Sequence, residues 1–261
     1  MGVVIAKALQ RGGGGKSQAA KHAGAKLALL GHRCLLIDTD PQASLSTGLG
    51  LKTSEVEKHT GNVLLGEAKM SEVIIQQVRP NLDIVPANIH LSRAEPKLLG
   101  MMMREHKLKN ALNEVRDQYD FTFIDCPPSL GLLTINALVA ADRVIIPVPC
   151  DIEGLVGLKL LLETINEIKA QANPNLSVLG IVVTRYDART NVSKDIFETI
   201  HQQLGQHYRV FKTALKENSS LKEAAMAGKT IYEYDARSSW AIDFDAFINE
   251  LLAAYEQDKA N

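Results

Sequence analysis

The sequence predicts an α/β fold: a single, doubly wound, mostly parallel β-sheet with helices on both faces. Short runs rich in valine, isoleucine and leucine alternate along the chain with longer helical patterns. Strands buried on both faces read as nearly continuous apolar runs, and intervening helices are typical of parallel strands. The chain has 261 residues, of which 46% are apolar, so it can enclose a large core.

Hydrophobic periodicity gives the elements of the first half. The apolar run from Val3 to Leu9 holds the first strand. An Ala/Leu-rich pattern predicts a helix over Ser17–Leu30 that ends at Gly31. Residues 43–80 are mixed and mostly helical, with loops near 48–53 and 59–61. The other expected elements are strands over Cys34–Ile37, Leu82–Val85 and Phe121–Asp125 and a helix over Leu98–Gln118.

The second half continues the alternation. Strands are expected over Arg143–Val148 and Val178–Val183, and helices over Leu133–Ala140 and Leu155–Ala170. A helix at about 193–204, a weak strand near 209–214 and helices over 220–227 and 240–255 complete the chain. No internal repeat, low-complexity tract or linker interrupts the pattern, so we expect one domain over residues 1–261.

A glycine-rich loop follows the first apolar run: Gln10-Arg11-Gly12-Gly13-Gly14-Gly15-Lys16-Ser17. Consecutive glycines let the backbone turn through positive φ and bring its N–H groups close to an anion, which the positive end of the next helix also attracts. Lys16 can reach the β- and γ-phosphates of a nucleotide, and Ser17 can place its hydroxyl on Mg²⁺. The usual P-loop pattern has glycine in place of Gln10. We nevertheless expect a nucleotide-binding segment from Arg11 to Gln18.

Three carboxylates follow predicted strands. Asp38 and Asp40 come after Cys34–Ile37, and Asp125 ends the run Phe121–Asp125. Ligands of such sheets bind at the carboxyl ends of the strands, so these acids should meet the glycine loop there. Phosphoryl transfer to water needs a held metal and an aligned water molecule. We expect Asp125 to hold Mg²⁺ through water, and Asp38 or Asp40 to orient the attacking water.

Composition limits the other possibilities. The net charge of −1 argues against a surface coated in basic residues, although a local basic patch is compatible with it. Cys34, Cys126 and Cys150 lie in or beside apolar runs, which is typical of reduced thiols rather than disulfides or a metal site. No secretory signal precedes the first strand and no apolar run is long enough to span a bilayer. We therefore expect a cytoplasmic protein.

Four strings carry a resemblance to a known family. They are Arg11-Gly-Gly-Gly-Gly-Lys-Ser, Leu36-Ile-Asp-Thr-Asp-Pro-Gln-Ala, Phe123-Ile-Asp-Cys-Pro-Pro-Ser-Leu-Gly-Leu-Leu-Thr-Ile-Asn-Ala-Leu and Tyr186-Asp-Ala-Arg-Thr-Asn. From residue 3 to about 250 the chain resembles the ParA/Soj branch of the ParA/MinD deviant Walker ATPases. The resemblance implies a homodimer that holds ATP and Mg²⁺ between its two copies, as a sandwich. This dimer binds the DNA of the nucleoid non-specifically, without preference for a sequence. The resemblance also implies a ParB-like or McdB-like adaptor that stimulates hydrolysis, so that the cycle positions a plasmid, chromosome or carboxysome.

The resemblance also assigns roles to residues. The matching positions are Lys16 and Ser17 for the phosphate and Mg²⁺ ligands, Asp125 for the Walker B acid, Asp40 for the water-orienting acid, Asp38 for the neighbouring acid on the Mg²⁺ side, and Gly12 for a glycine that lets two protomers approach. The resemblance thus gives Lys16, Asp38 and Asp40 catalytic roles, and makes Ser17, Asp38 and Asp125 the metal residues.

The chain departs from the family at position 11. The family carries a lysine there that reaches the partner's phosphates, whereas this chain has Arg11, which is planar and forked. Either Arg11 acts in trans, or another cation has replaced it. The candidates for this other cation are Lys159 and Lys7. If Lys159 has no such role, it is simply a solvated charge on a helix, and if Lys7 has none, it forms a structural pair with a nearby acid. Loss of the lysine also resembles McdA-like, carboxysome-positioning variants.

Basic residues are in slight excess near the C-terminus. Residues 185–237 contain nine Lys or Arg against seven Asp or Glu. Arg189 matches a DNA-contacting arginine of the family, but a second one aligns with Ser220, so we expect Lys216 and Lys222 to complete a DNA surface. An ordinary solvated surface is the alternative for each. The neutral-to-acidic end, residues 251–261, does not favour membrane binding.

The sequence leaves two main functions open. One is a slow ATPase whose dimer binds DNA, and the retained Asp40 favours it. The other is a nucleotide-gated DNA-binding scaffold with negligible hydrolysis, which the arginine at position 11 keeps open. A small-molecule P-loop kinase fits the loop after Asp125 poorly.

Overall fold

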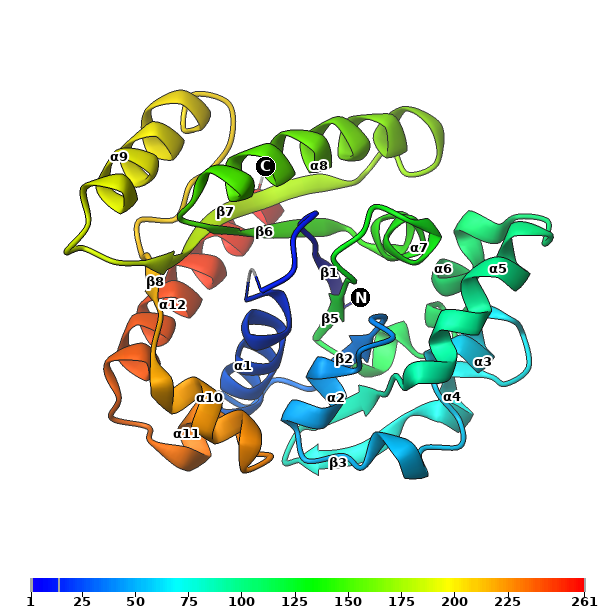
Figure 1. Cartoon of the computed structure of the whole chain (residues 1–261). Coiled ribbons are helices and arrows are strands. Elements are labelled where there is room, and N and C mark those ends of the chain that lie inside the picture. The colour runs from blue at the N-terminus through cyan, green and yellow to red at the C-terminus, as the bar shows by residue number, and fades with distance from the viewer. Residues whose placement is uncertain (1, 14, 261) are drawn as a thin grey trace.

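The computed structural model describes residues 2–13 and 15–260, which form one eight-stranded sheet with helices on both faces (Figure 1). The strand order is β3-β4-β2-β5-β1-β6-β7-β8. Every pair of neighbours is parallel except β3 and β4. The strands are β1 Val3–Lys7, β2 Cys34–Asp38, β3 Ile75–Arg79, β4 Leu82–Val85, β5 Phe121–Asp125, β6 Arg143–Pro149, β7 Ser177–Tyr186 and β8 Leu215–Lys216. The predicted fold class is confirmed.

Helices of very different lengths connect these strands. The α-helices are α1 Lys16–Leu29, α2 Ser44–Gly48, α3 Thr60–Leu64, α4 Met70–Val73, α5 Ala94–Leu99, α6 Lys107–Leu112, α7 Leu132–Ala140, α8 Ile152–Gln171, α9 Asn191–Thr199, α10 Ser219–Met226, α11 Ile231–Tyr234 and α12 Ser239–Ala260. Short 3₁₀ turns cover Thr53–Glu55, Ile89–Arg93, Arg104–His106 and Arg116–Gln118, and a π-helical turn covers Ile200–Leu204. No helix among the described residues is long and apolar enough to cross a membrane.

The sheet separates two apolar cores. Val3 and Ile5 of β1 face the core beneath α1 and α12, whereas Val4 and Ala6 face the core beneath α7 and α8 (Figure 1). This alternation explains why β1 reads as a continuous apolar run. The prediction of one domain over residues 1–261 stays a prediction.

Helix α1 packs unusually close to the sheet. A Cβ atom added to Gly24 would lie 2.7 Å from a methyl carbon of Leu36, so a larger residue here would require the Leu36 side chain to move. The helix ends where the sequence predicts, because Gly31 adopts a φ of 94° and the His32 N–H bonds the Leu27 carbonyl. Residues at its start are thereby held over the ends of the central strands.

The predicted long helix over Leu98–Gln118 is wrong. The chain leaves α5 at Gly100 and passes through Met103, which has a φ of 51°, before α6 begins. The side chain of Asn136 on α7 accepts from the Leu108 N–H at 3.1 Å and donates to the Arg104 carbonyl at 2.8 Å. Tertiary bonds therefore replace the intrahelical bonds that a continuous helix would make.

Two further predictions need correction. Residues 43–80, expected to be mostly helical, contain the edge strand β3, which forms a hairpin with β4 through Asn81 at a φ of 59°. The weak strand near 209–214 is reduced to a single bridge between Val210 and Ile181, and β8 follows it as two residues. Both segments lie at sheet edges, where hydrophobic alternation is weakest.

Candidate functional site

The glycine loop forms one wall of a pocket of about 520 Å³ at the carboxyl ends of the strands. This glycine-loop pocket is lined on the loop side by Gly12, Gly13, Gly15, Lys16, Ser17 and Gln18. Its opposite wall consists of Lys216, Glu217, Asn218, Leu221, Lys222 and Trp240. Asp40 also lines it. Of the predicted Arg11–Gln18 segment, the structure thus brings all but two residues to one site: Arg11 does not line the pocket, and Gly14 lies outside the described residues.

Two glycines of the loop take conformations that other residues rarely adopt. Gly13 has a φ of 70° and Gly15, the residue that precedes α1, has a φ of 80°. A Cβ atom added to Gly12 would meet nothing within 4 Å. Contacts with the described residues therefore do not require glycine at position 12.

Lys16 begins α1 and is 6% exposed. Its Nζ donates a hydrogen bond to the carbonyl of Arg11, across the turn of the loop. Burial lowers the pKa of Lys16, and the nearby Asp125 carboxyl opposes that change. The ammonium group thus stands inside the loop, where an anion bound by the backbone N–H groups would meet it.

Asp38 is fixed by its own loop. Its Oδ2 accepts from the N–H of Ser46 at 2.9 Å and from the Ser46 hydroxyl at 2.7 Å, and its Oδ1 accepts from the Asp40 N–H at 3.1 Å. Complete burial raises the pKa of Asp38 to about 6, against the effect of these hydrogen bonds. Sequence reasoning missed Ser46, which organises this acid.

Asp125 is fully buried, and its charge is only partly compensated. Neither carboxylate oxygen accepts a hydrogen bond of normal geometry from any described residue. Burial raises the pKa of Asp125 well above its ordinary value, Asp38 adds to the rise, and the Ser17 hydroxyl opposes it. A buried carboxylate with free lone pairs beside a serine hydroxyl is the donor set that a hard cation such as Mg²⁺ needs. The predicted metal residues Ser17, Asp38 and Asp125 therefore fit a magnesium ion.

Asp40 differs from its two neighbours because it is partly exposed and lines the pocket. Its Oδ1 accepts from the N–H of Gln42 at 2.9 Å, which orients the carboxylate. This position suits the predicted role of orienting water.

Arg11 is engaged within its own chain. Its guanidinium pairs with Asp151, the residue before α8, and with Glu153 at 3.0 Å. Asp151 also accepts from the Gly154 N–H and so caps α8. The sequence signal for Asp151 was present, since it follows the end of β6, as Asp38 and Asp125 end β2 and β5. The contact connects the glycine loop to α8.

The other two candidate cations behave differently. The prediction that Lys7 could reach the phosphates of a partner is wrong, because its side chain is fully buried. Its Nζ donates to the Ala19 carbonyl of α1 at 2.6 Å and lies 5.0 Å from the centre of the Phe123 ring. Burial lowers the pKa of Lys7 to about 7, while Asp125 opposes the change. Lys159, by contrast, is exposed on α8.

The predicted DNA-contact residues occupy two places. Arg189 is 89% exposed between β7 and α9, where it pairs with Asp187 at 2.8 Å. Lys216 and Lys222 line the glycine-loop pocket and pair with Asp243 at 3.1 Å and with Glu217 at 3.4 Å. These two lysines are thus available to a ligand in the pocket as well as to an external polyanion.

Trp240 on α12 was not predicted as part of the site. It is the one tryptophan of the chain, is 3% exposed, and lies with its ring centre 4.5 Å from Phe244 and 4.8 Å from His22. Because it lines the glycine-loop pocket, its fluorescence reports directly on that pocket.

Known proteins share both the sequence and the fold. A family model described as AAA domain matches residues 2–178. The chain is 42% identical to the sporulation initiation inhibitor protein Soj of Bacillus subtilis (strain 168), over 92% of this chain and 94% of that protein. It is 40% identical to the chromosome-partitioning ATPase Soj of Treponema pallidum (strain Nichols), over 97% and 98% of the two chains.

Solved structures give the same grouping. Cobyrinic acid a,c-diamide synthase of Mycobacterium smegmatis, with bound ADP and magnesium, superposes with a TM-score of 0.84 at 33% identity, over 98% of this chain and 96% of that one. Apo McdA of Cyanothece superposes with a TM-score of 0.87 over 97% and 100% of the chains, and at 22% identity it supports the fold alone. The match over residues 2–178 and the two Soj proteins decide the family. The chain belongs to the AAA domain family and, within it, to the ParA/MinD-type ATPases.

Proposed function

We propose that this chain is an ATPase that forms a sandwich homodimer with ATP and Mg²⁺, binds non-specific DNA and positions a cargo. The observation that carries the proposal is the orphaned Asp125 carboxylate beside Ser17, opposite a glycine loop that encloses the ammonium of Lys16. A buried negative group and a positive loop, both without a compensating ligand, suit a metal–triphosphate pair.

Each group has a task in this proposal. Mg²⁺, when bound, neutralises charge on the β- and γ-phosphates. Ser17 and Asp125 hold the ion, and Asp38, fixed by Ser46, completes the negative side of the site. Lys16 exchanges the Arg11 carbonyl for a phosphate oxygen, and Asp40 orients the attacking water.

Dimerisation follows from the open side of the glycine loop. Gly12 and Gly13 have empty space where a Cβ would project, so a second copy can approach the loop closely. Arg11 or Lys159 would supply the cation that reaches the partner's phosphates. Arg189, and Lys216 and Lys222 where the nucleotide leaves them free, would contact DNA phosphates. A ParB-like or McdB-like adaptor would then stimulate hydrolysis.

The second candidate is a nucleotide-gated DNA-binding scaffold that scarcely hydrolyses ATP. The pairing of Arg11 with Asp151 and Glu153 favours it, because an arginine held within its own chain gives no help to the partner's phosphates.

One experiment tests both functions. Trp240 fluorescence is titrated with Mg²⁺-ATP, light scattering gives the molecular mass, and phosphate release is followed with DNA present. Binding, a doubled mass and phosphate release support the ATPase, whereas binding and dimerisation without phosphate release support the scaffold. A chain that stays monomeric and retains no nucleotide in saturating Mg²⁺-ATP contradicts both.

A further inference from the structure

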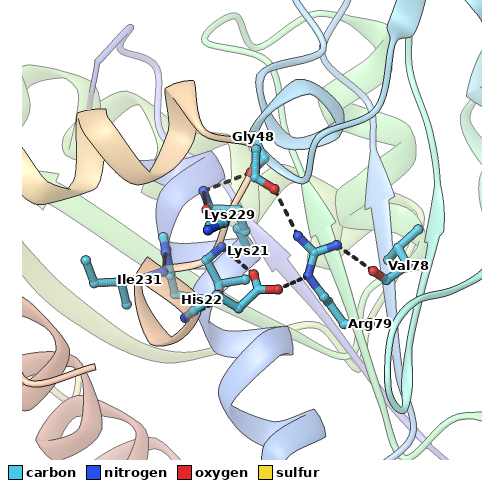
Figure 2. A network of polar contacts seen from close by, with 10 residues as sticks. Lys21, His22, Gly48, Val78, Arg79, Lys229 and Ile231 are labelled. Carbon is cyan, nitrogen blue, oxygen red and sulfur yellow. Dashed lines mark hydrogen bonds and ion pairs between the residues drawn. The ribbon is translucent and has the colours of Figure 1, made fainter. Parts of the chain in front are cut away.

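A second lysine of α1 is buried away from the phosphate site. Lys21 is 1% exposed, and its Nζ donates to the carbonyls of Gly48 and Lys229, each at 3.1 Å (Figure 2). An ammonium group taken out of water is costly unless its donors are bonded. A methionine of similar length would fill the same space without that cost, so packing alone does not account for a lysine here.

The two carbonyls belong to two different segments that both contribute to the lining of the glycine-loop pocket. Gly48 ends α2, whose Ser44 lines the pocket and whose Ser46 holds Asp38. Lys229 follows α10, whose Leu221 and Lys222 line the opposite wall. One ammonium on α1 therefore ties the loop that carries the acids to the segment that follows α10.

The same junction brings two backbones into direct contact. Gly50 and Gly228 have φ values of 89° and 64°, and a Cβ added to Gly228 would lie 2.7 Å from the Cα of Gly50. Arg79 closes the junction: its guanidinium donates to the Gly228 carbonyl at 2.9 Å and pairs with Glu233 at 2.5 Å (Figure 2). A shift of α2 would therefore displace Gly228 directly, because no side chain lies between the two backbones.

His22 makes a parallel link from the pocket to α11. Its Nε2 accepts from the N–H of Ile231 at 3.0 Å, so the ring proton is on Nδ1, which donates to the carbonyl of Gln18 at 2.8 Å. Gln18 lines the glycine-loop pocket. The first residue of α11 is thus two hydrogen bonds from a residue that a bound phosphate would contact.

We propose that Lys21 is a positioning residue that couples occupancy of the glycine-loop pocket to the segment from Ser219 to Tyr234, which we call the α10–α11 arm. The coupling rests on the proposed binding of ATP. When a nucleotide orders α1 and α2, the Lys21 ammonium, with His22 beside it, holds the arm against them. Because the arm carries Lys222, which lines the pocket, this coupling makes the position of that cation respond to the nucleotide.

Hydrogen–deuterium exchange tests the coupling on the full chain, with and without Mg²⁺-ATPγS. In the wild type we expect slower exchange at both α2 and residues 228–234. In Lys21→Met we expect α2 to respond as before, while the nucleotide-dependent protection of residues 228–234 falls about tenfold. Lys97→Met is the control, since Lys97 lies on α5 and pairs with Glu67. It should leave both responses unchanged.

The outcomes separate the two proposals. If Mg²⁺-ATPγS changes Trp240 fluorescence but leaves residues 228–234 of the wild type unprotected, the coupling is overturned and the proposed function survives. The coupling is likewise overturned if the arm of Lys21→Met is protected as in the wild type. No binding to the wild type overturns both proposals. Should Lys21→Met fail to fold, Lys21→Gln takes its place, and the wild-type measurement requires no variant.

Discussion

Asp38 and Asp125 are register partners across the neighbouring strands β2 and β5, so their side chains leave the same face of the sheet side by side. Both are completely buried, and Asp38 contributes to the raised pKa of Asp125. Because water does not reach these two adjacent carboxylates, the binding of a cation or a proton beside them is strongly favoured.

This pair predicts how stability changes with pH. Raised pKa values mean that the folded chain binds more protons than the unfolded one, so stability without Mg²⁺ should fall as the pH rises from about 4 through 6. We expect a loss of about 1–3 kcal/mol over that range. Urea unfolding in EDTA measures it.

The Asp125→Asn variant should lose the part of that slope that Asp125 contributes, while Asp38 keeps its own part, and Mg²⁺ should stabilise the wild type but not the variant. A wild-type stability that is flat between pH 4 and 7 would contradict the unshielded pair.

Lys16 and Asp40 should fail in different ways. Lys16→Ala removes the ammonium from the glycine loop, so ATP affinity should fall more than about tenfold, as measured by Trp240 fluorescence. Asp40→Ala should keep the ATP-bound dimer but stop phosphate release, because the pocket stays charged while the water is no longer oriented. Lys97→Ala, an exposed lysine paired with Glu67, is the control. Normal ATP binding by Lys16→Ala would refute the site.

The pairing of Arg11 predicts opposite effects for two variants. Arg11→Ala should weaken the ATP-dependent dimer. Asp151→Asn with Glu153→Gln should strengthen it several-fold, because it frees the guanidinium for the partner's phosphates. Sedimentation at increasing ATP measures both. A dimer that is unchanged in Arg11→Ala but lost in Lys159→Ala would assign the trans contact to α8.

Lys7 gives a second dependence on pH, of the opposite sign. Its pKa of about 7 lies below that of an unfolded lysine, so the unfolded chain binds more protons between about pH 7 and 10. Lys7 should therefore raise stability with pH there, by at most about 1.4 kcal/mol per pH unit. The Lys7→Met variant should be more stable at pH 7 and lack this rise. Equal slopes in wild type and variant would show that Lys7 does not titrate there.

Arg189 should contribute to DNA binding through charge alone. Arg189→Ala is expected to weaken binding to DNA of unrelated sequences equally and to reduce the salt dependence by about one counterion. Fluorescence anisotropy at several salt concentrations measures it, with Lys97→Ala as the control. A sequence-dependent loss would point instead to base contacts.

The sequence predicted the centre of the sheet better than its margins. Strands β1, β2 and β5 are buried on both faces, so their continuous apolar runs are readily recognised as strands of a covered parallel sheet. The acids at the ends of β2 and β5 lie at one rim of the sheet, as the sequence predicts. The hairpin of β3, half-exposed and bulged, and the helix broken by Asn136 depend on contacts between distant segments. The same limit applies to the site: Ser46 and Trp240 act through tertiary neighbours that no local spacing reveals.

The margins of the sheet have a consequence for how copies of this chain associate. β3 carries an irregular register and Gln77 at a φ of 52°, while β8 is only two residues long. Neither offers the long, flat row of backbone donors and acceptors onto which a foreign strand could be added. Growth of the sheet from one molecule into the next is thereby disfavoured at both of its edges.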